Sequence, residues 1–321
     1  MMLKHGLKHI WLKDNKEIFR ICRKTDRIQG QKQMKKSVLA SLISEVLKIA
    51  KSQTQKIYMR KLDNSPVRAA IDNARPPKWM NARRVNTANG GVYYLNEDSR
   101  DAVIIYLHGG AYVHGFSIPH WNFIRKLIKR SGAAVIAPDY LGVPNGTYKE
   151  AYKLLIPLYI KCAASRRKLI VMGDSAGGGL ALGLVEMIKK KNVRLPDELI
   201  LISPWLDVSL ENKKIKQFDK IDPWLAIEPS RERGKQWAGD LDIHDPKISP
   251  IYGKYQDLSH VTVFTGTNEI LYPDIVGFFN ELDKDNDNEL VIGENMNHIY
   301  VLYPIPEAKP AVDLIIGKIK S

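Results

Sequence analysis

The sequence predicts an α/β fold in which a mostly parallel central sheet lies between layers of helices. Short apolar runs that are typical of buried strands alternate with helical segments across residues 76–321. A glycine-rich turn joins one of these strands directly to a helix, as expected where parallel strands are linked through helices. With 321 residues, 44% of them hydrophobic, the chain is long enough to bury such a sheet.

The expected elements follow one another along residues 76–321. Runs rich in Val, Ile and Leu between turn residues predict strands, and longer amphipathic segments predict helices. Strands are predicted at 91–95, 103–107, 133–137, 168–172, 198–202, 261–265 and 289–292, and helices at 148–161, 176–190 and 306–318. The segment 205–247, rich in Trp, Asp and Pro, interrupts the alternation and is expected to form a cap insertion over the carboxyl edge of the sheet.

Residues 1–75 are predicted to form a basic helical segment that is part of the cap, and the break at 75–79 marks the start of the second domain, 76–321. Residues 1–60 hold 15 Lys/Arg against 4 Asp/Glu, which is +11 of the total net charge of +14. Such a segment is expected to be a solvated helix face, with weak contact to a membrane surface as a further role. No zinc-finger spacing or RNA-recognition signature is present, so no nucleic-acid partner is expected.

The run that begins at Met34 has two interpretations. It opens like a signal peptide, but Glu45 lies inside the apolar stretch. The spacing of Val38, Leu39, Leu42, Ile43, Val46 and Leu47 instead predicts an amphipathic helix. The two cysteines, Cys22 and Cys162, form no disulfide framework, and no run of about 18 apolar residues indicates a transmembrane helix. A cytoplasmic protein is therefore expected, and a homo-oligomer is compatible with the sequence.

A candidate nucleophile lies where a predicted strand meets a predicted helix. Residues 169–172, Leu-Ile-Val-Met, run directly into Gly-Asp-Ser-Ala-Gly-Gly at 173–178. The G-x-S-x-G pattern places its serine on a sharp turn with the hydroxyl exposed above the sheet. The pattern alone also fits an ordinary glycine-rich turn, so the strand and helix around it carry the prediction that Ser175 is a nucleophile.

A second glycine pair follows the strand predicted at 103–107. The sequence there is Tyr-Leu-His-Gly-Gly-Ala-Tyr, residues 106–112. Small residues allow backbone N–H groups to approach a developing oxyanion, so Gly109 and Gly110 are the expected donors, together with Ala176 after the nucleophile. His108 is expected to tie this loop rather than to transfer protons.

The general base is expected after the nucleophile and after the acid. Three histidines follow Ser175, namely His244, His260 and His298. His244 lies in the cap-like segment, and His260 precedes the strand that should carry the acid. His298 lies in a loop between the strand at 289–292 and the last helix, so it is the predicted base.

The acid has two candidates. Glu269 follows the end of the strand at 261–265, and Asp274 lies five residues further along. A carboxylate at either place would orient the His298 imidazole and stabilise its charged form. Glu269 is favoured because Asp274 follows Pro273, where an aspartate is expected to cap the start of a helix.

These motifs resemble those of the hormone-sensitive-lipase-like esterases, the GDXG group of the α/β-hydrolases. The resemblance rests on the order and spacing of residues 108–110, 173–178, 266–271 and 296–298 and covers roughly residues 80–320. It departs from the family at Ala111, where a third glycine is usual, at Glu269, where Asp is usual, and over residues 140–145.

The resemblance implies an α/β-hydrolase fold with a helical cap and hydrolysis of short-chain carboxylic esters without a cofactor. The expected triad is Ser175, His298 and Glu269, and the partner is a small ester; no metal site is expected. Two alternatives remain open from the residues alone. One is an amidase or peptidase with the same triad, and the other is an inactive ligand-binding homologue.

Overall fold

The computed structural model describes residues 36–60, 75–255, 258, 260–283 and 286–321. The chain divides into two compact units, residues 1–36 and 37–321, and all the described helices and strands lie in the second. This boundary differs from the predicted one at residue 75, because helix α2 (Val38–Arg60) is bonded to residues far along the same unit. Of the predicted basic segment 1–75, residues 1–35 and 61–74 lie outside the described residues.

The predicted α/β class is confirmed by a sheet of eight strands that is mostly parallel. Its order is β1-β2-β4-β3-β5-β6-β7-β8, with β1 and β2 antiparallel to their neighbours and the rest parallel. The strands are β1 Arg83–Thr87, β2 Gly90–Leu95, β3 Ala102–Leu107, β4 Ala134–Tyr140, β5 Lys168–Asp174, β6 Glu198–Ile202, β7 Val261–Gly266 and β8 Glu289–Gly293.

Seven strands agree with the predicted runs to within a few residues, and the edge strand β1 was not predicted. Its sequence, Arg-Arg-Val-Asn-Thr, has no apolar alternation, and all five residues are exposed. The strand exists because it pairs with β2, from Arg83 opposite Tyr94 to Thr87 opposite Gly90. Cross-strand pairing, which no local pattern records, decides its structure.

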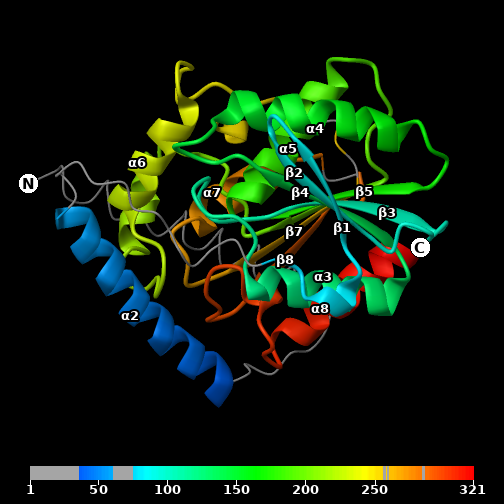
Figure 1. The fold of residues 1–321 in the computed structure, drawn as a ribbon. Helices are drawn as coiled ribbons and strands as arrows, with labels where there is room; N and C mark the ends of the chain where they lie inside the picture. Colours follow the sequence, from blue (N-terminus) through cyan, green and yellow to red (C-terminus); the bar gives the residue numbers. More distant parts are fainter. Residues whose placement is uncertain (1–35, 61–74, 256–257, 259, 284–285) are drawn as a thin grey trace, which may run out of the picture. The chain divides into compact units, whose positions relative to one another are not determined.

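Helices cover both faces of the sheet (Figure 1). One apolar core joins one face to α4, α5 and α7, and a second joins the other face to α3 and α8. The prediction missed α3, and of α7 it gave only a helix start near Asp274. These helices are α3 Ile118–Ser131, α4 Tyr148–Ala163, α5 Ala176–Lys189, α7 Tyr272–Glu281 and α8 Ala308–Lys320. Because the parallel strands point the same way, the residues after their carboxyl ends meet at one edge of the sheet.

The segment between β6 and β7 holds no strand among its described residues. It contains the short helix η2 (Lys213–Gln217), helix α6 (Ile227–Ala238) and the turn η3 (Pro250–Tyr252). Helix α6 lies beside α2 (Figure 1). The interruption predicted at 205–247 is therefore present, and its role as a cap stays a prediction.

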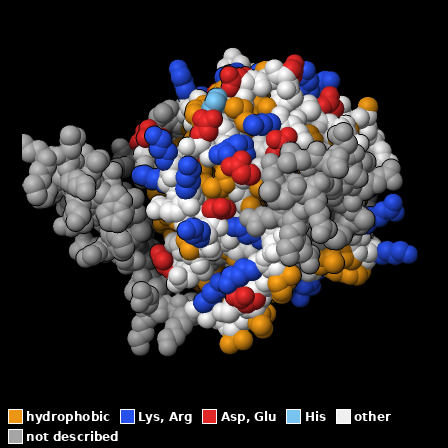
Figure 2. Space-filling view, turned by 90° about the vertical axis from the view of Figure 1, so that its left-hand side faces the viewer, with side chains coloured by type: hydrophobic (Ala, Val, Ile, Leu, Met, Phe, Trp, Pro, Cys, Tyr) orange, Lys and Arg blue, Asp and Glu red, His pale blue; other side chains and the backbone are white. Residues whose placement is uncertain are grey.

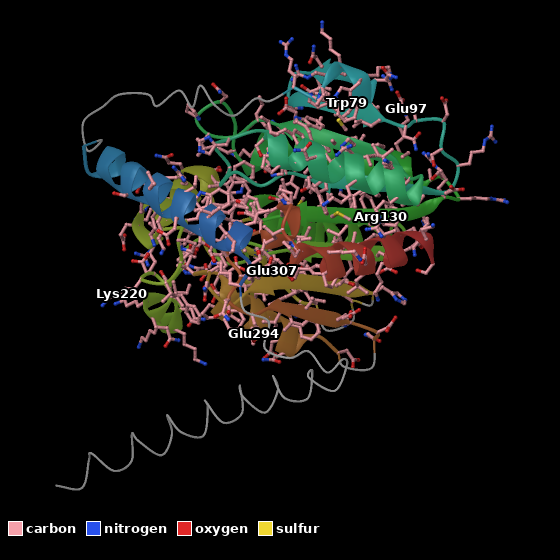
Figure 3. All side chains as sticks on the ribbon, turned by 90° about the horizontal axis from the view of Figure 1, so that it is seen from below. Trp79, Glu97, Arg130, Lys220, Glu294 and Glu307 are labelled. Atoms are coloured by element: carbon pink, nitrogen blue, oxygen red, sulfur yellow. The ribbon has the colours of Figure 1, made fainter. Side chains whose placement is uncertain are left out.

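Helix α2 is fixed at its start by polar contacts rather than by its apolar face. The Ser37 hydroxyl accepts a hydrogen bond from the Ala40 N–H at 3.1 Å, as an N-cap does. Glu307, at the start of α8, accepts bonds from the Ser37 N–H at 2.6 Å and from the Ser37 hydroxyl at 3.0 Å, and Figure 3 shows it beside this end of α2.

The amphipathic helix predicted around residues 38–47 is present, but most of its apolar face is not the buried one. The residues it packs inward are the small Ala40 and Ser44, with the partly buried Ile43 beside them. Among the apolar positions, Val38, Leu39, Leu42, Val46 and Ile49 are all exposed. Polar contacts at the helix start and at Lys51 orient α2, and they leave this apolar stripe facing outward.

Charges of both signs are interspersed over the described part of the face in Figure 2. This mixture agrees with the composition of residues 61–321, which hold 34 Lys/Arg and 31 Asp/Glu. Within the described ranges, no helix is long and apolar enough to cross a bilayer. Cys162 is buried in α4 as a free thiol, and Cys22 lies outside the described residues.

Candidate active site

Ser175 lies on a tight turn between β5 and α5. Its φ of +53° is in the left-handed region, which non-glycine residues rarely adopt. The flanking glycines are needed because the chains come close: a Cβ on Gly173 would lie 2.3 Å from the Gly177 carbonyl oxygen. A Cβ on Gly177 would lie 2.1 Å from the Leu107 oxygen. The turn holds the serine at the carboxyl edge of the sheet and at the start of a helix.

The glycine loop after β3 runs beside Ser175. A Cβ on Gly109 would lie 3.0 Å from the Cβ of Ser175, and Gly110 has a φ of +116° that favours glycine. Within the described chain, the N–H groups of Gly109, Gly110 and Ala176 donate no hydrogen bond to another protein group. Three free donors near one hydroxyl suit the stabilisation of an oxyanion.

His298 connects Ser175 to Glu269. His298 Nε2 lies 2.8 Å from Ser175 Oγ, and His298 Nδ1 lies 2.5 Å from Glu269 Oε2. His298 comes from the loop after β8, and Glu269 comes from the loop after β7. Both side chains are buried, at 2% and 0% exposed. A serine, an imidazole and a carboxylate in this order match the arrangement of a catalytic triad.

Glu269 is held by other groups besides His298. Its Oε1 accepts hydrogen bonds from Ser203 Oγ at 2.9 Å, Thr265 Oγ1 at 2.7 Å and the Gly266 N–H at 2.9 Å. Three donors on one oxygen hold the carboxyl group in place and leave the other oxygen aimed at His298.

The structure does not bring Asp274 to His298. Asp274 is buried on α7, and its Oδ1 accepts a hydrogen bond from Asn212 Nδ2 at 2.7 Å. The expected capping role is wrong as well, because the N-cap of α7 is Leu271 and Asp274 lies in the first turn. Burial raises the pKa of Asp274 to about 7. It is therefore a buried carboxyl group that is bonded to the segment between β6 and β7.

Behind Ser175, the neighbouring Asp174 is fully buried in a polar cluster. The Tyr106 hydroxyl donates to its Oδ1 at 2.6 Å, and His120 Nε2 lies 3.2 Å from its Oδ2. Burial raises the pKa of Asp174, but the attraction of His120 and the two hydrogen bonds outweigh it, so the pKa lies below its usual value. The sequence reasoning did not single out His120 or Tyr106.

His108 lies in the glycine loop after β3 as a packed ring. It stacks on Tyr140 with ring centroids 4.3 Å apart, and its Nδ1 lies 2.7 Å from the Gly109 carbonyl oxygen. Burial lowers the pKa of His108 to about 4, so the ring is neutral near pH 7 and its N–H can donate to that carbonyl. These contacts hold the loop, as expected from the sequence.

Two further residues beside the triad were missed by the sequence reasoning. Asp222 is 2% exposed, and the Trp224 ring lies edge-on to His298 with centroids 5.6 Å apart. Burial raises the pKa of Asp222 to about 6, although nearby N–H groups and His298 oppose that rise. No local pattern distinguishes this aspartate, because it meets the triad only through the fold. In the described ranges, no group of three or more His, Cys, Asp or Glu side chains is placed to hold a metal ion.

The fold and this site are those of a hydrolase-type α/β protein with a serine on the turn between β5 and α5. A family model described as the alpha/beta hydrolase fold matches residues 104–302. The chain belongs to this α/β-hydrolase family, and the membership predicted from the motifs is confirmed.

Curated and solved relatives are consistent with that family. An esterase of Acinetobacter venetianus is 31% identical over 55% of this chain, and a triacylglycerol lipase of Mycobacterium tuberculosis is 31% identical over 64%. The matches span 59% and 47% of those relatives. A crystal structure from Staphylococcus aureus, provisionally assigned as an esterase, has a TM-score of 0.73 and 27% identity over 85% of this chain and 93% of that one.

Proposed function

We propose that this protein is a serine esterase that hydrolyses short-chain carboxylic esters. The proposal rests on a continuous series of hydrogen bonds beside the Gly109 loop. Ser175 Oγ lies 2.8 Å from His298 Nε2, and His298 Nδ1 lies 2.5 Å from Glu269 Oε2. Relatives named esterase and triacylglycerol lipase support ester bonds as the target.

The geometry supports a two-step reaction through an acyl-enzyme. Ser175 Oγ attacks the ester carbonyl carbon while His298 Nε2 takes the hydroxyl proton, and the N–H groups of Gly109, Gly110 and Ala176 receive the oxyanion. The C–O bond to the alcohol then breaks, and His298 returns the proton to the leaving alkoxide. Water, deprotonated by His298, releases the carboxylic acid and restores Ser175.

Acyl chains from acetyl to about hexanoyl are the proposed substrates. The sequence offers no long apolar lid helix, and the resemblance stated from the motifs points to small esters. Ser175 itself is only 8% exposed, and the Trp224 ring packs edge-on against His298. The chain length is measured directly by comparing the turnover of p-nitrophenyl butyrate and p-nitrophenyl palmitate, and faster turnover of the palmitate would exclude this class.

A panel of matched p-nitrophenyl esters and p-nitroanilides tests the reaction type. The full chain should hydrolyse the acetyl and butyryl esters, and Ser175→Ala should reduce kcat by at least about 10³-fold, since the nucleophile is lost. Ser52→Ala, an exposed serine on α2, is the matched control and should leave kcat unchanged. Faster cleavage of the anilides would indicate an amidase, and no cleavage of either would indicate an inactive homologue.

A further inference from the structure

The loop between η2 and α6 contacts both sides of the triad through one carboxyl group. Asp222 Oδ1 accepts hydrogen bonds from the N–H groups of Trp224 at 2.7 Å and Leu225 at 2.8 Å. Its Oδ2 accepts a bond from the N–H of Ile270 at 2.8 Å. Ile270 follows Glu269 in the chain, so Asp222 holds the backbone directly beside the triad carboxylate.

The same carboxyl group determines where Trp224 lies. The Trp224 backbone is bound to Asp222 Oδ1, and its ring packs edge-on against His298 at an interplanar angle of 64°. One oxygen of Asp222 therefore fixes the residue that packs on the base, and the other fixes the residue next to the acid. A shift of either segment would change how His298 lies between Ser175 and Glu269.

Lys51 of helix α2 binds this loop through hydrogen bonds. Lys51 Nζ lies 2.6 Å from the Asp219 carbonyl oxygen, 3.0 Å from the Asp222 carbonyl oxygen and 3.4 Å from Asp219 Oδ1. An ammonium group has three N–H donors, and here it has three acceptors on one loop. The Lys51 side chain is 12% exposed, so water competes little for these bonds. Lys220, on the same loop, lies on the side of the molecule where α2 runs (Figure 3).

We propose that Asp222 is a positioning residue of the Ser175–His298–Glu269 triad and that Lys51 anchors it from α2. The N-terminal helix thereby helps to hold the geometry of the reacting groups, although it contributes no reacting atom. The kinetic part of this inference rests on the proposed esterase function. Its physical basis is that a misplacement of about 1 Å in a catalytic group can cost about 10²-fold in rate.

Asp222→Asn separates this role from simple folding. The amide oxygen can still accept the Trp224 and Leu225 N–H groups, but an NH2 group replaces Oδ2 and cannot accept the Ile270 N–H. With p-nitrophenyl butyrate we expect kcat to fall by about 10- to 100-fold, with KM within about threefold of wild type.

Lys51 variants test the anchor with a matched control on the same helix. Lys51→Met should reduce kcat by about 5- to 10-fold, and Lys51→Arg should restore most of it, because an arginine also donates to carbonyl oxygens. Lys48→Met is the control: Lys48 is 57% exposed and pairs with Glu45, so its loss should leave kcat unchanged. If both residues act through one loop, the Asp222→Asn/Lys51→Met double variant should lose little more than Asp222→Asn alone.

A readout that needs no substrate keeps the inference separate from the esterase proposal. The His298 Nδ1–Glu269 hydrogen bond should give a downfield proton resonance that Asp222→Asn shifts or broadens while circular dichroism stays unchanged. An unchanged resonance together with an unchanged kcat in folded Asp222→Asn would overturn the inference. It would also be overturned if the kcat loss of the double variant equalled the product of the losses in the two single variants. A wild-type protein without esterase activity would refute the proposed function alone, because the resonance would still test the positioning.

Discussion

Glu269 and Asp274 lie five residues apart, and the fold gives them different surroundings. Glu269 receives three hydrogen bonds on one oxygen and presents the other to His298. Among the described residues, Asp274 has one bond, from Asn212, and its Oδ2 has no hydrogen-bond partner. The difference follows from position: Glu269 follows the end of β7 at the carboxyl edge of the sheet, whereas Asp274 is already within α7.

Glu269→Gln should lower kcat by roughly 10²–10⁴-fold with little change in KM, because the neutral amide no longer stabilises the imidazolium. Asp274→Asn should retain most activity, because Asp274 is bonded to Asn212 and not to the triad. Steady-state kinetics with p-nitrophenyl butyrate measures both variants. The opposite order of damage would identify Asp274 as the acid.

The stability of the protein should depend on the Asp274 charge. Its pKa of about 7 lies above the ordinary value of 3.8, so the native state keeps a proton that the unfolded chain releases first. Stability from this group is therefore present below about pH 4 and is lost as the pH rises toward 7. Asp274→Asn should raise Tm at pH 8 by several degrees relative to wild type, and the gain should shrink at pH 4.5.

Thermal unfolding at both pH values measures this effect. Asp98→Asn, an exposed aspartate, is the matched control and should show no such pH-dependent gain. A gain for Asp274→Asn that is equal at pH 4.5 and pH 8 would show that the effect comes from packing rather than from the charge.

Helix α2 shows how the orientation of one element follows from a few polar contacts. Its start is bonded to Glu307, and Lys51 is bonded to the 219–222 loop. These contacts turn Ala40 and Ser44 inward, so Val38, Leu42, Val46 and Ile49 recur on the outward face at i, i+4, i+8 and i+11. All four are 59–79% exposed. This exposed apolar stripe is therefore a candidate surface for contact with an apolar partner, such as a membrane.

The predicted contact with a membrane surface can be tested on that stripe. Residues 27–60 hold eight Lys/Arg and one acid, Glu45, and a basic segment with an apolar stripe favours anionic lipid. Leu42→Glu/Val46→Glu should reduce co-sedimentation with phosphatidylglycerol vesicles by at least about fivefold. The control is the variant Ile118→Glu/Ile160→Glu, which changes two exposed isoleucines outside α2 and should leave co-sedimentation unchanged.

Two other outcomes would contradict this membrane contact. If both variants co-sediment with vesicles as much as wild type does, vesicle binding does not depend on the stripe. A wild-type dimer that the Leu42→Glu/Val46→Glu variant splits would show instead that the stripe joins two copies of the chain. The predicted homo-oligomer and cytoplasmic location stay predictions.

For the whole molecule, the unit boundary falls between residues 36 and 37, so the basic stretch 1–36 and the sheet with its site belong to different units. Every residue of the candidate site lies in the unit 37–321. A truncation of residues 1–33 should therefore keep kcat on p-nitrophenyl butyrate within about threefold, whereas it should weaken vesicle binding. More than tenfold loss of kcat with unchanged circular dichroism would contradict this separation.

The sequence determined the parts of this protein that depend on local patterns. Apolar runs with turn residues between them gave the core strands, and glycines at 173 and 177 placed Ser175 on its turn, because no side chain fits against the Leu107 backbone there. The order of serine, carboxylate and histidine then pointed to His298 as the base. The strands and the turn are encoded within a few neighbouring residues, and the base follows from the order of motifs along the chain.

The tertiary structure decided what depends on contacts between distant segments. Strand β1 is a strand because it pairs with β2, and α2 faces outward with its apolar residues because Glu307 and the 219–222 loop hold it. Asp222 is an ordinary loop aspartate in the sequence and meets Ile270 and the triad only after folding. The physical reason is that hydrogen bonding and burial of a side chain are set by which chain segments become neighbours, and periodicity carries no record of that.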